Sequence, residues 1–166
     1  MDSITKRRSI RKYTGQKVPK EKVLKLLEAA MSAPSAGNER PWEFIVAMEA
    51  SLLNKLADVS PYSKMIEHAA AAIIVLGDKS KTRFGDFWIQ DCSAATENIL
   101  IEAVEQELGA VWLGVFPDES RVEFVRKLFS LPGDITPFSI IPVGHPAEEF
   151  PPSSRYDAKR VHWDRW

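Results

Sequence analysis

Apolar residues recur at helical spacing in several stretches of the chain. In the first long stretch, 20–32, they place one apolar face on a helix that Pro19 opens and Pro34 ends. A second helix is expected from an N-cap at Asp118 through Phe129. Shorter helices are predicted over 3–8, 51–59 and 62–70.

The longest predicted helix, 84–108, is apolar on two sides. One stripe, at steps of three and four, consists of Phe84, Trp88, Cys92, Ala95, Ile99 and Ala103. The second stripe consists of Phe87, Ala94, Ile101, Val104 and Leu108. A helix that is apolar on more than one side must be covered on more than one side. In a chain of 166 residues, we expect the second cover to be another subunit.

Runs of large and branched residues predict strands over 42–48, 71–76, 110–116 and 138–143. The run 71–76 is continuously apolar, as expected for a strand covered on both faces. Strands and helices alternate, which predicts an α+β fold, an α/β/α sandwich with a central sheet of about four strands. The length fits one domain, 1–166.

Composition and charge narrow the function classes. Hydrophobic residues make up 45% of the chain and charged residues 27%, with a net charge of −1, so a nucleic-acid partner is disfavoured. The single cysteine, Cys92, excludes an internal disulfide and is expected to be a small core residue. No signal peptide is visible, and the longest apolar run, 69–76, is too short to span a bilayer. We expect a cytoplasmic protein that makes no membrane contact.

The segment from Lys6 to Lys12, here called the basic segment, carries five cationic side chains in seven positions. The guanidinium fork of arginine suits phosphate and other flat, electron-rich acceptors, and Ser9 adds a short donor. Ile10 in the middle indicates that one side of the segment is anchored. The alternative is a solvated basic face at a terminus.

The chain lacks the usual catalytic motifs. His68, His145 and His162 are scattered, without the spacing of a metal site. No G-x-S-x-G elbow, Rossmann glycine motif or Walker loop is present. This pattern is typical of a protein in which a bound cofactor supplies the reactivity.

Four further features agree with the basic segment. Pro34-Ser35-Ala36-Gly37-Asn38 and Pro41-Trp42-Glu43-Phe44 follow the first long helix, Gly109 to Gly114 comes later, and Pro142-Val143-Gly144-His145-Pro146 leads to Arg155. In this order and spacing they resemble the nitroreductase family of FMN-dependent oxidoreductases, in its small single-domain branch. The resemblance covers nearly the whole chain. It implies a mostly antiparallel central sheet flanked by helices, a long central dimer helix, and a homodimer with FMN at the subunit interface.

The resemblance also implies cofactor-binding residues. They are Arg7, Arg8, Ser9 and Arg11 in the basic segment; Pro34, Ser35 and Asn38 in a loop that reaches FMN from the other subunit; Trp112, Leu113, Gly114 and Val115 beside the flavin's reactive nitrogen; Gly144; and Arg155 near the phosphate. Lys64 matches a position at the pyrimidine edge. Many relatives carry an acidic residue before the glycine matched by Gly114, and a lysine where this chain has Ser153.

The activity implied is a ping-pong transfer of hydride from NADH or NADPH, through the flavin, to a nitroaromatic, a quinone or a similar small electron-poor acceptor. Two alternatives remain: a flavin-binding or carrier protein without turnover, and a same-fold flavoenzyme that dehalogenates or consumes its flavin. The C-terminal tail, 151–166, contains Trp163 and Trp166, and we expect it to dock onto the partner subunit.

Overall fold

The computed structural model describes residues 2–151 and 153–166. Its helices are α1 (Asp2–Lys6), α2 (Lys20–Met31), α3 (Ala50–Leu56), α4 (Phe87–Glu105) and α5 (Glu119–Phe129). Its strands are β1 (Trp42–Ala47), β2 (Ala71–Asp78), β3 (Gly109–Ala110), β4 (Leu113–Gly114) and β5 (Ile135–Gly144). Short 3₁₀ turns are η1 (Ala36–Asn38), η2 (Lys64–His68), η3 (Lys79–Lys81) and η4 (Ala158–Arg160).

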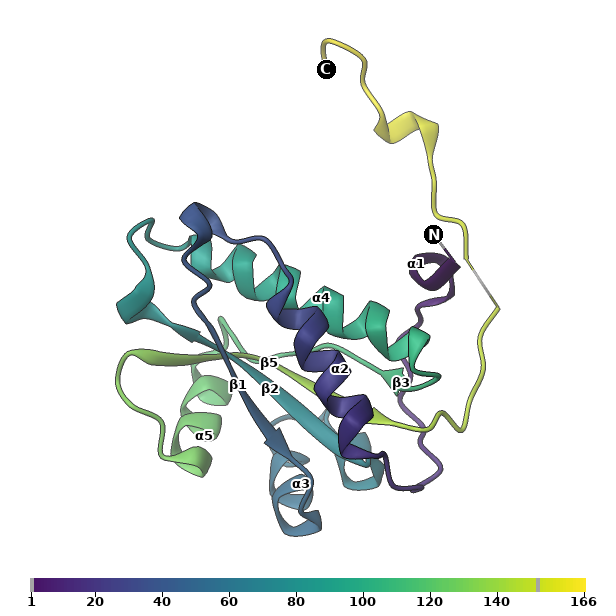
Figure 1. Ribbon diagram of the computed structural model, residues 1–166, viewed down its shortest axis with the longest axis vertical. Coiled ribbons are helices and arrows are strands. Elements are labelled where there is room, and N and C mark those ends of the chain that lie inside the picture. Colours follow the sequence, from purple (N-terminus) through teal and green to yellow (C-terminus); the bar gives the residue numbers. More distant parts are fainter. Residues whose placement is uncertain (1, 152) are drawn as a thin grey trace.

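The strands form one antiparallel sheet in the order β1-β2-β5-β3, with β4 also paired to β5 (Figure 1). Every residue of β2 is buried, which confirms the prediction of a strand covered on both faces. Ile73 and Val75 pack into one apolar cluster with α2 and α4. Ile74 and Leu76 face the opposite cluster, with α3, α5 and η2. The predicted α/β/α sandwich with an antiparallel sheet is confirmed.

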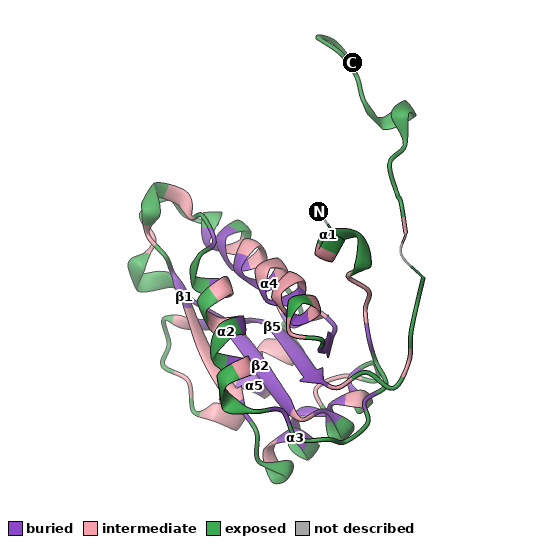
Figure 2. Cartoon of the chain, turned by 45° about the vertical axis from the view of Figure 1, so that its right-hand side comes forward, coloured by how far each residue is buried: buried purple, intermediate pink, exposed green. Residues whose placement is uncertain are grey.

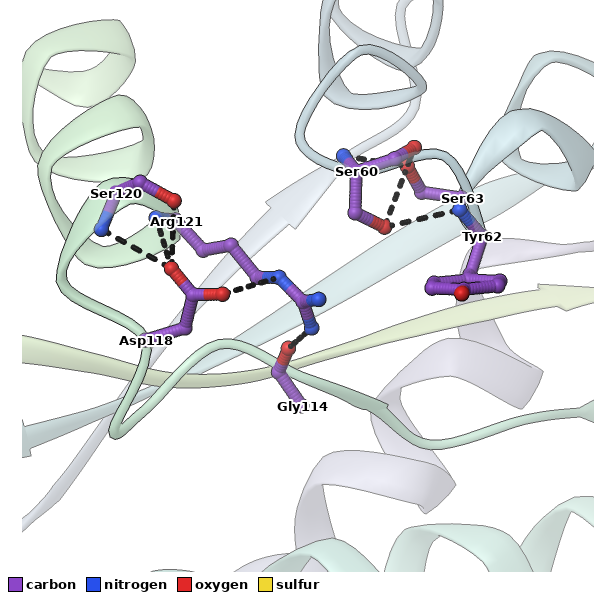
Figure 3. Close-up of polar contacts among 7 residues, drawn as sticks. All are labelled: Ser60, Tyr62, Ser63, Gly114, Asp118, Ser120 and Arg121. Atoms are coloured by element: carbon purple, nitrogen blue, oxygen red, sulfur yellow. Dashed lines mark hydrogen bonds and ion pairs between the residues drawn. The ribbon is translucent and has the colours of Figure 1, made fainter.

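Two predicted elements differ from the structure. The strand expected over 110–116 is divided into β3 and β4, which keep one register against β5 and leave Val111 and Trp112 between them. The helix expected over 62–70 is only the 3₁₀ turn η2. Ser63 Oγ lies 2.6 Å from Ser60 O and 2.9 Å from Ala57 O, and it accepts the Ser60 N–H (Figure 3). These local bonds compete with helical hydrogen bonds.

Helix α4 begins at Phe87, three residues later than predicted, and its two apolar stripes have different environments. Trp88, Cys92 and Ala95 of the first stripe are buried against the sheet. In the second stripe, the Phe87 side chain is 50% exposed and Ile101 is half-buried. Figure 2 shows buried residues along α4 alternating with residues of mostly intermediate exposure. Apart from Leu108, which is buried, the second stripe therefore has an uncovered apolar surface in the protomer.

The tail runs past α1, where Ser153 to Tyr156 line a hollow with Arg7, and beyond Tyr156 it extends away from the body of the protein (Figure 1). Trp163 is 84% exposed and Trp166 is fully exposed, although the ring of Trp166 stacks on His162. Among the described residues, no helix is both long enough and apolar enough to cross a membrane.

Candidate functional site

The basic segment is anchored through Ile10 and Tyr13, both of which are buried. Ile10 N–H donates to Ala110 O of β3 at 3.0 Å, and Ser9 forms a parallel bridge with Ala110. The Tyr13 hydroxyl lies 2.8 Å from Ile10 O and 3.2 Å from Pro142 O, and burial raises its pKa. The expectation that Ile10 anchors one side of the segment is confirmed.

Two glycines allow this close approach. A Cβ on Gly109 would stand 2.6 Å from Ile10 Cγ2, and a Cβ on Gly144 would stand 2.9 Å from Tyr13 Cδ1. Both distances are far below van der Waals contact. Gly144 therefore lies under the anchor of the basic segment, where its role is to admit the Tyr13 ring.

The chain after β5 covers the other side of the basic segment. Glu148 Oε1 accepts hydrogen bonds from Arg11 N–H at 2.6 Å and Lys12 N–H at 3.2 Å. Arg8 Nη1 donates to Pro151 O at 2.6 Å, and its guanidinium lies 5.2 Å from the centre of the Phe150 ring. The segment is thus clamped between β3 and residues 146–151, which fixes its backbone while the cationic side chains stay near the surface.

The arginines of this region converge on neighbouring hollows. Arg7 pairs with Glu97 of α4 at 3.3 Å, and Arg7, Glu97 and Arg155 line one hollow. Arg8 lines another with Lys6 and Glu148. Among the described residues, the Arg11 side chain has only a long contact, 3.5 Å, from Nη1 to Ser9 O. The structure therefore brings Arg155, distant in sequence, to the basic segment.

Strand β4 is held by Arg121 (Figure 3). Arg121 Nη1 donates to Gly114 O at 2.9 Å, and Arg121 Nε pairs with Asp118 Oδ2 at 3.1 Å. Asp118 caps α5 as predicted, and the Ser120 hydroxyl, followed by the Arg121 N–H, lowers the Asp118 pKa. No atom lies within 4 Å of the position that a Cβ on Gly114 would take, so the main chain of β4 faces open space there.

The other predicted residues of this stretch are less open. Val115 is buried in the core and Trp112 packs edge-on against Phe138 with ring centres 5.7 Å apart. Leu113 is half-buried against the same cluster as Val115. A ligand beside β4 would therefore contact the main chain of Val115 and not the Val115 side chain.

Lys64 lies at the start of η2, whose Met65 packs against the Ile10 and Tyr13 anchor. Its ammonium pairs with Asp58 at 2.6 Å and Glu67 at 3.6 Å, and the bond to Asp58 raises its pKa. Lys64 is therefore a cation near the anchor of the basic segment, and its charge is partly balanced by two carboxylates.

The loop that carries Pro34, Ser35 and Asn38 lies apart from these residues. Ala36 N–H of this loop donates to Asp91 Oδ1 at 2.9 Å, next to Phe87 at the start of α4. The basic segment lies at the opposite half of α4, where Arg7 pairs with Glu97 and Arg8 lines a hollow with Leu100 and Val104 (Figure 1). Within one protomer, the two groups of predicted residues are not joined into one site.

Asn38 and Ser35 make contacts inside their own loop. Asn38 has a φ of 58°, and its Oδ1 accepts from Arg40 Nε at 3.0 Å. Ser35 Oγ accepts from Arg40 N–H at 2.9 Å. Both side chains thus shape the loop in the protomer.

Three residues that position the site were missed from the sequence: Glu148, Arg121 and Asp91. Glu148 gave no local signal, because its contacts with Arg11 and Lys12 join opposite ends of the chain. Asp91 did have a local signal in the sequence, because helical spacing places it beside Trp88 and Cys92 on the buried face of α4. Cys92 is buried as expected, and burial raises its thiol pKa to about 12.

The family model for the nitroreductase family matches residues 4–145. A protein of Methanothermobacter thermautotrophicus, provisionally named NADH dehydrogenase/NAD(P)H nitroreductase, is 48% identical over the whole chain and 87% of its own length. The structure of an FMN-dependent nitroreductase from Clostridium difficile superimposes with a TM-score of 0.92 at 33% identity, covering 99% of this chain and 98% of that one. The structure of a provisionally named nitroreductase from Desulfovibrio desulfuricans, in complex with FMN, superimposes with a TM-score of 0.85 at 31% identity. The match covers 99% of this chain and 96% of that one. The chain therefore belongs to the nitroreductase family.

Proposed function

We propose that the protein is an FMN-dependent oxidoreductase that takes hydride from NADH or NADPH and reduces small electron-poor acceptors such as nitroaromatics or quinones. The observation that carries this proposal is the clamped basic segment, which holds Arg7, Arg8 and Arg11 beside β3. The relative from Desulfovibrio desulfuricans, whose structure contains FMN, supports the choice of cofactor.

The residues present fit FMN. Its phosphate and ribityl oxygens require several donors. Arg7 and Arg155 in one hollow and Arg8 in the neighbouring one can supply them, together with Ser9 from the same segment. Its flat ring requires a surface without protruding side chains, and the main chain at Gly114 has open space beside it. Lys64 supplies a further cation near the anchor of the basic segment.

We further propose that the site is completed in a homodimer. The loop with Ser35 and Asn38 lies at one end of α4 and the basic segment at the other, while the second apolar stripe of α4 is uncovered. A two-fold pairing of α4 helices would cover this stripe and bring each loop to the partner's basic segment. In this arrangement, residues 1–166 form one domain whose tail, 151–166, lies on the partner.

Bound FMN supplies the hydride chemistry in such a protein. The chain's part is to bind and orient: Arg7, Arg8 and Arg155 neutralise phosphate, and Arg121 fixes the carbonyl of Gly114 so that β4 keeps its position. A cationic group such as Lys64 or Arg11 at the pyrimidine end favours a negatively charged ring. No carboxylate occurs from Trp112 to Val115, so solvent is the proposed source of protons. Because both substrates would use one opening in turn, we propose ping-pong kinetics in a cytoplasmic enzyme.

The deciding experiment is an absorbance spectrum of the purified protein, recorded before and after anaerobic addition of NADH or NADPH. We expect a flavin spectrum that bleaches with the reductant and returns when a quinone is added. A flavin that stays oxidised would favour the carrier alternative. A protein that binds no flavin after incubation with FMN would overturn the proposal at its centre.

A further inference from the structure

Asp91 is a buried carboxylate on α4 that its surroundings satisfy only in part. It is 5% exposed, and its Oδ1 accepts the hydrogen bond from Ala36 N–H of the cofactor loop. Among residues 2–151 and 153–166, its Oδ2 has no hydrogen-bonding partner. A buried carboxylate oxygen without a donor is strongly unfavourable, so native structures rarely keep one. A donor from outside the protomer would remove this penalty.

The surroundings of Asp91 are open toward the uncovered side of α4. Asp91 lines a surface hollow with Pro34, Ser35, Ala36, Phe87, Gln90 and Ala94. Phe87 and Ala94 belong to the second apolar stripe, the surface that we assign to a second subunit. The unsatisfied carboxylate therefore lies where the proposed interface meets the cofactor loop.

The basic segment provides a matching charge. It places five cations in seven residues, and within its own protomer it contacts α4 at Glu97, well beyond Asp91. Among the described residues, Arg8 and Arg11 are its arginines without an ion pair, and Arg11 makes only a 3.5 Å contact, to Ser9 O. In a two-fold pairing, the Asp91 end of one α4 helix approaches the basic end of the other.

We propose that Asp91 is a positioning residue that links subunit association to the cofactor loop. Its Oδ1 holds residues 34–38 through Ala36, and its Oδ2 receives a cationic donor from the basic segment of a second copy of this chain. Because Oδ2 is itself buried in the protomer, the carboxylate must turn toward the hollow that Asp91 lines to meet that donor. The inference rests on the homodimer in the proposed function.

The variant Asp91→Asn distinguishes the roles of the two carboxylate oxygens. Its amide oxygen can still accept the Ala36 N–H, but its NH₂ group cannot accept a donor in place of Oδ2. We expect an unchanged far-UV circular dichroism spectrum, a dimer dissociation constant of the FMN-free protein raised at least tenfold, and a raised FMN dissociation constant. Sedimentation velocity over a dilution series and quenching of FMN fluorescence measure these constants.

Asp78→Asn is the matched control. Asp78 is 8% exposed, but both of its oxygens have partners inside the protomer, Ser80 and Lys81. The same carboxylate-to-amide change there should leave both dissociation constants within about twofold, because it touches neither the loop nor the second stripe. An Asp91→Asn protein that dimerises like the wild type would overturn the proposal.

A second measurement tests the donor. Replacing Arg7, Arg8 and Arg11 together by glutamine should weaken dimerisation of the FMN-free protein when Asp91 is present. In the Asp91→Asn background the same change should add little, because the acceptor is already lost. Fully additive effects would exclude the basic segment as the donor. Because these measurements need no FMN, they remain decisive even if the protein binds no flavin.

Discussion

In the basic segment, Arg11 has its backbone N–H held by Glu148, while its guanidinium makes only a long contact with Ser9 O among the described residues. If it binds FMN, Arg11→Ala removes a charge-assisted hydrogen bond, and the FMN dissociation constant should rise about tenfold or more. Arg126→Ala is the matched control, because Arg126 lies on α5 and donates to Pro132 O. Fluorescence titration with FMN measures both variants. Unchanged affinity in Arg11→Ala would remove this residue from the site.

Gly109 tests whether the anchor of the basic segment matters for cofactor binding. In Gly109→Ala, the new methyl group would lie 2.6 Å from Ile10 Cγ2, so the segment must shift away from β3. We expect a loss of about 1–3 kcal/mol in the free energy of unfolding, together with weaker FMN binding. Gly133→Ala, with no atom within 4 Å of the new Cβ, should change neither quantity. Urea unfolding and FMN titration provide the comparison, and equal behaviour of the two variants would contradict it.

At the scale of elements, the turn η3 follows directly on Asp78, the last residue of β2. Burial alone would raise the Asp78 pKa, but hydrogen bonds from Ser80 and Lys81 outweigh it and lower the pKa below that of an ordinary aspartate. Lys81 also pairs with Glu43 of β1. A folded pKa below the unfolded value stabilises the fold above the unfolded pKa, and the stabilisation is lost as pH falls through the folded pKa.

The advantage of the wild type over Asp78→Asn in unfolding free energy should therefore be complete at pH 7. It should shrink as the pH falls below about 4, where Asp78 is protonated in the unfolded chain, and be lost as the pH passes the lower pKa of the folded protein. Urea unfolding of both proteins at pH 7 and pH 3 measures this difference. Comparing the two proteins at each pH cancels the contribution of the other carboxylates to the unfolding free energy, because they titrate alike in both proteins. A difference that is equal at both pH values would show that the charge of Asp78 contributes nothing.

Elements whose signals are local were predictable from the sequence. The two stripes of α4 and the continuous apolar run of β2 each follow from the spacing of neighbouring residues. The interruption at Val111 and Trp112 was not predictable, because it depends on pairing with β5. The same holds for the site: the cations of the basic segment are visible in the sequence, whereas the clamp by Glu148 joins residues more than a hundred positions apart.

At the scale of the whole molecule, the tail is the segment with the least support inside the protomer. Trp163 is 84% exposed and Trp166 is fully exposed. If the tail is an arm on the partner, truncation after Arg160 should shift the dimer dissociation constant upward, because buried aromatic area would be lost. Tyr62→Ser removes an aromatic ring that is 74% exposed on the body, and it serves as the control. An unaltered sedimentation profile of the truncated protein would reject the arm.

The composite site makes the strictest prediction about the whole molecule, because it specifies which subunit contributes each residue. Arg11→Ala should impair the basic segment. Asn38→Ala should impair the loop, although Asn38→Gly is the cleaner deletion because a φ of 58° suits glycine. Each variant alone should bind FMN weakly. If the two halves come from different subunits, a heterodimer of the variants contains one doubly altered site and one intact site.

Unfolding and refolding an equal mixture of the Arg11→Ala and Asn38→Gly proteins should therefore restore tight FMN binding in about one quarter of all sites, since half of the dimers are mixed. Refolding each variant separately should restore none, which controls for the treatment itself. If the loop served the basic segment of its own chain, every site in the mixture would carry one altered residue. Tight binding would then be absent, and the placement of FMN between subunits would be wrong.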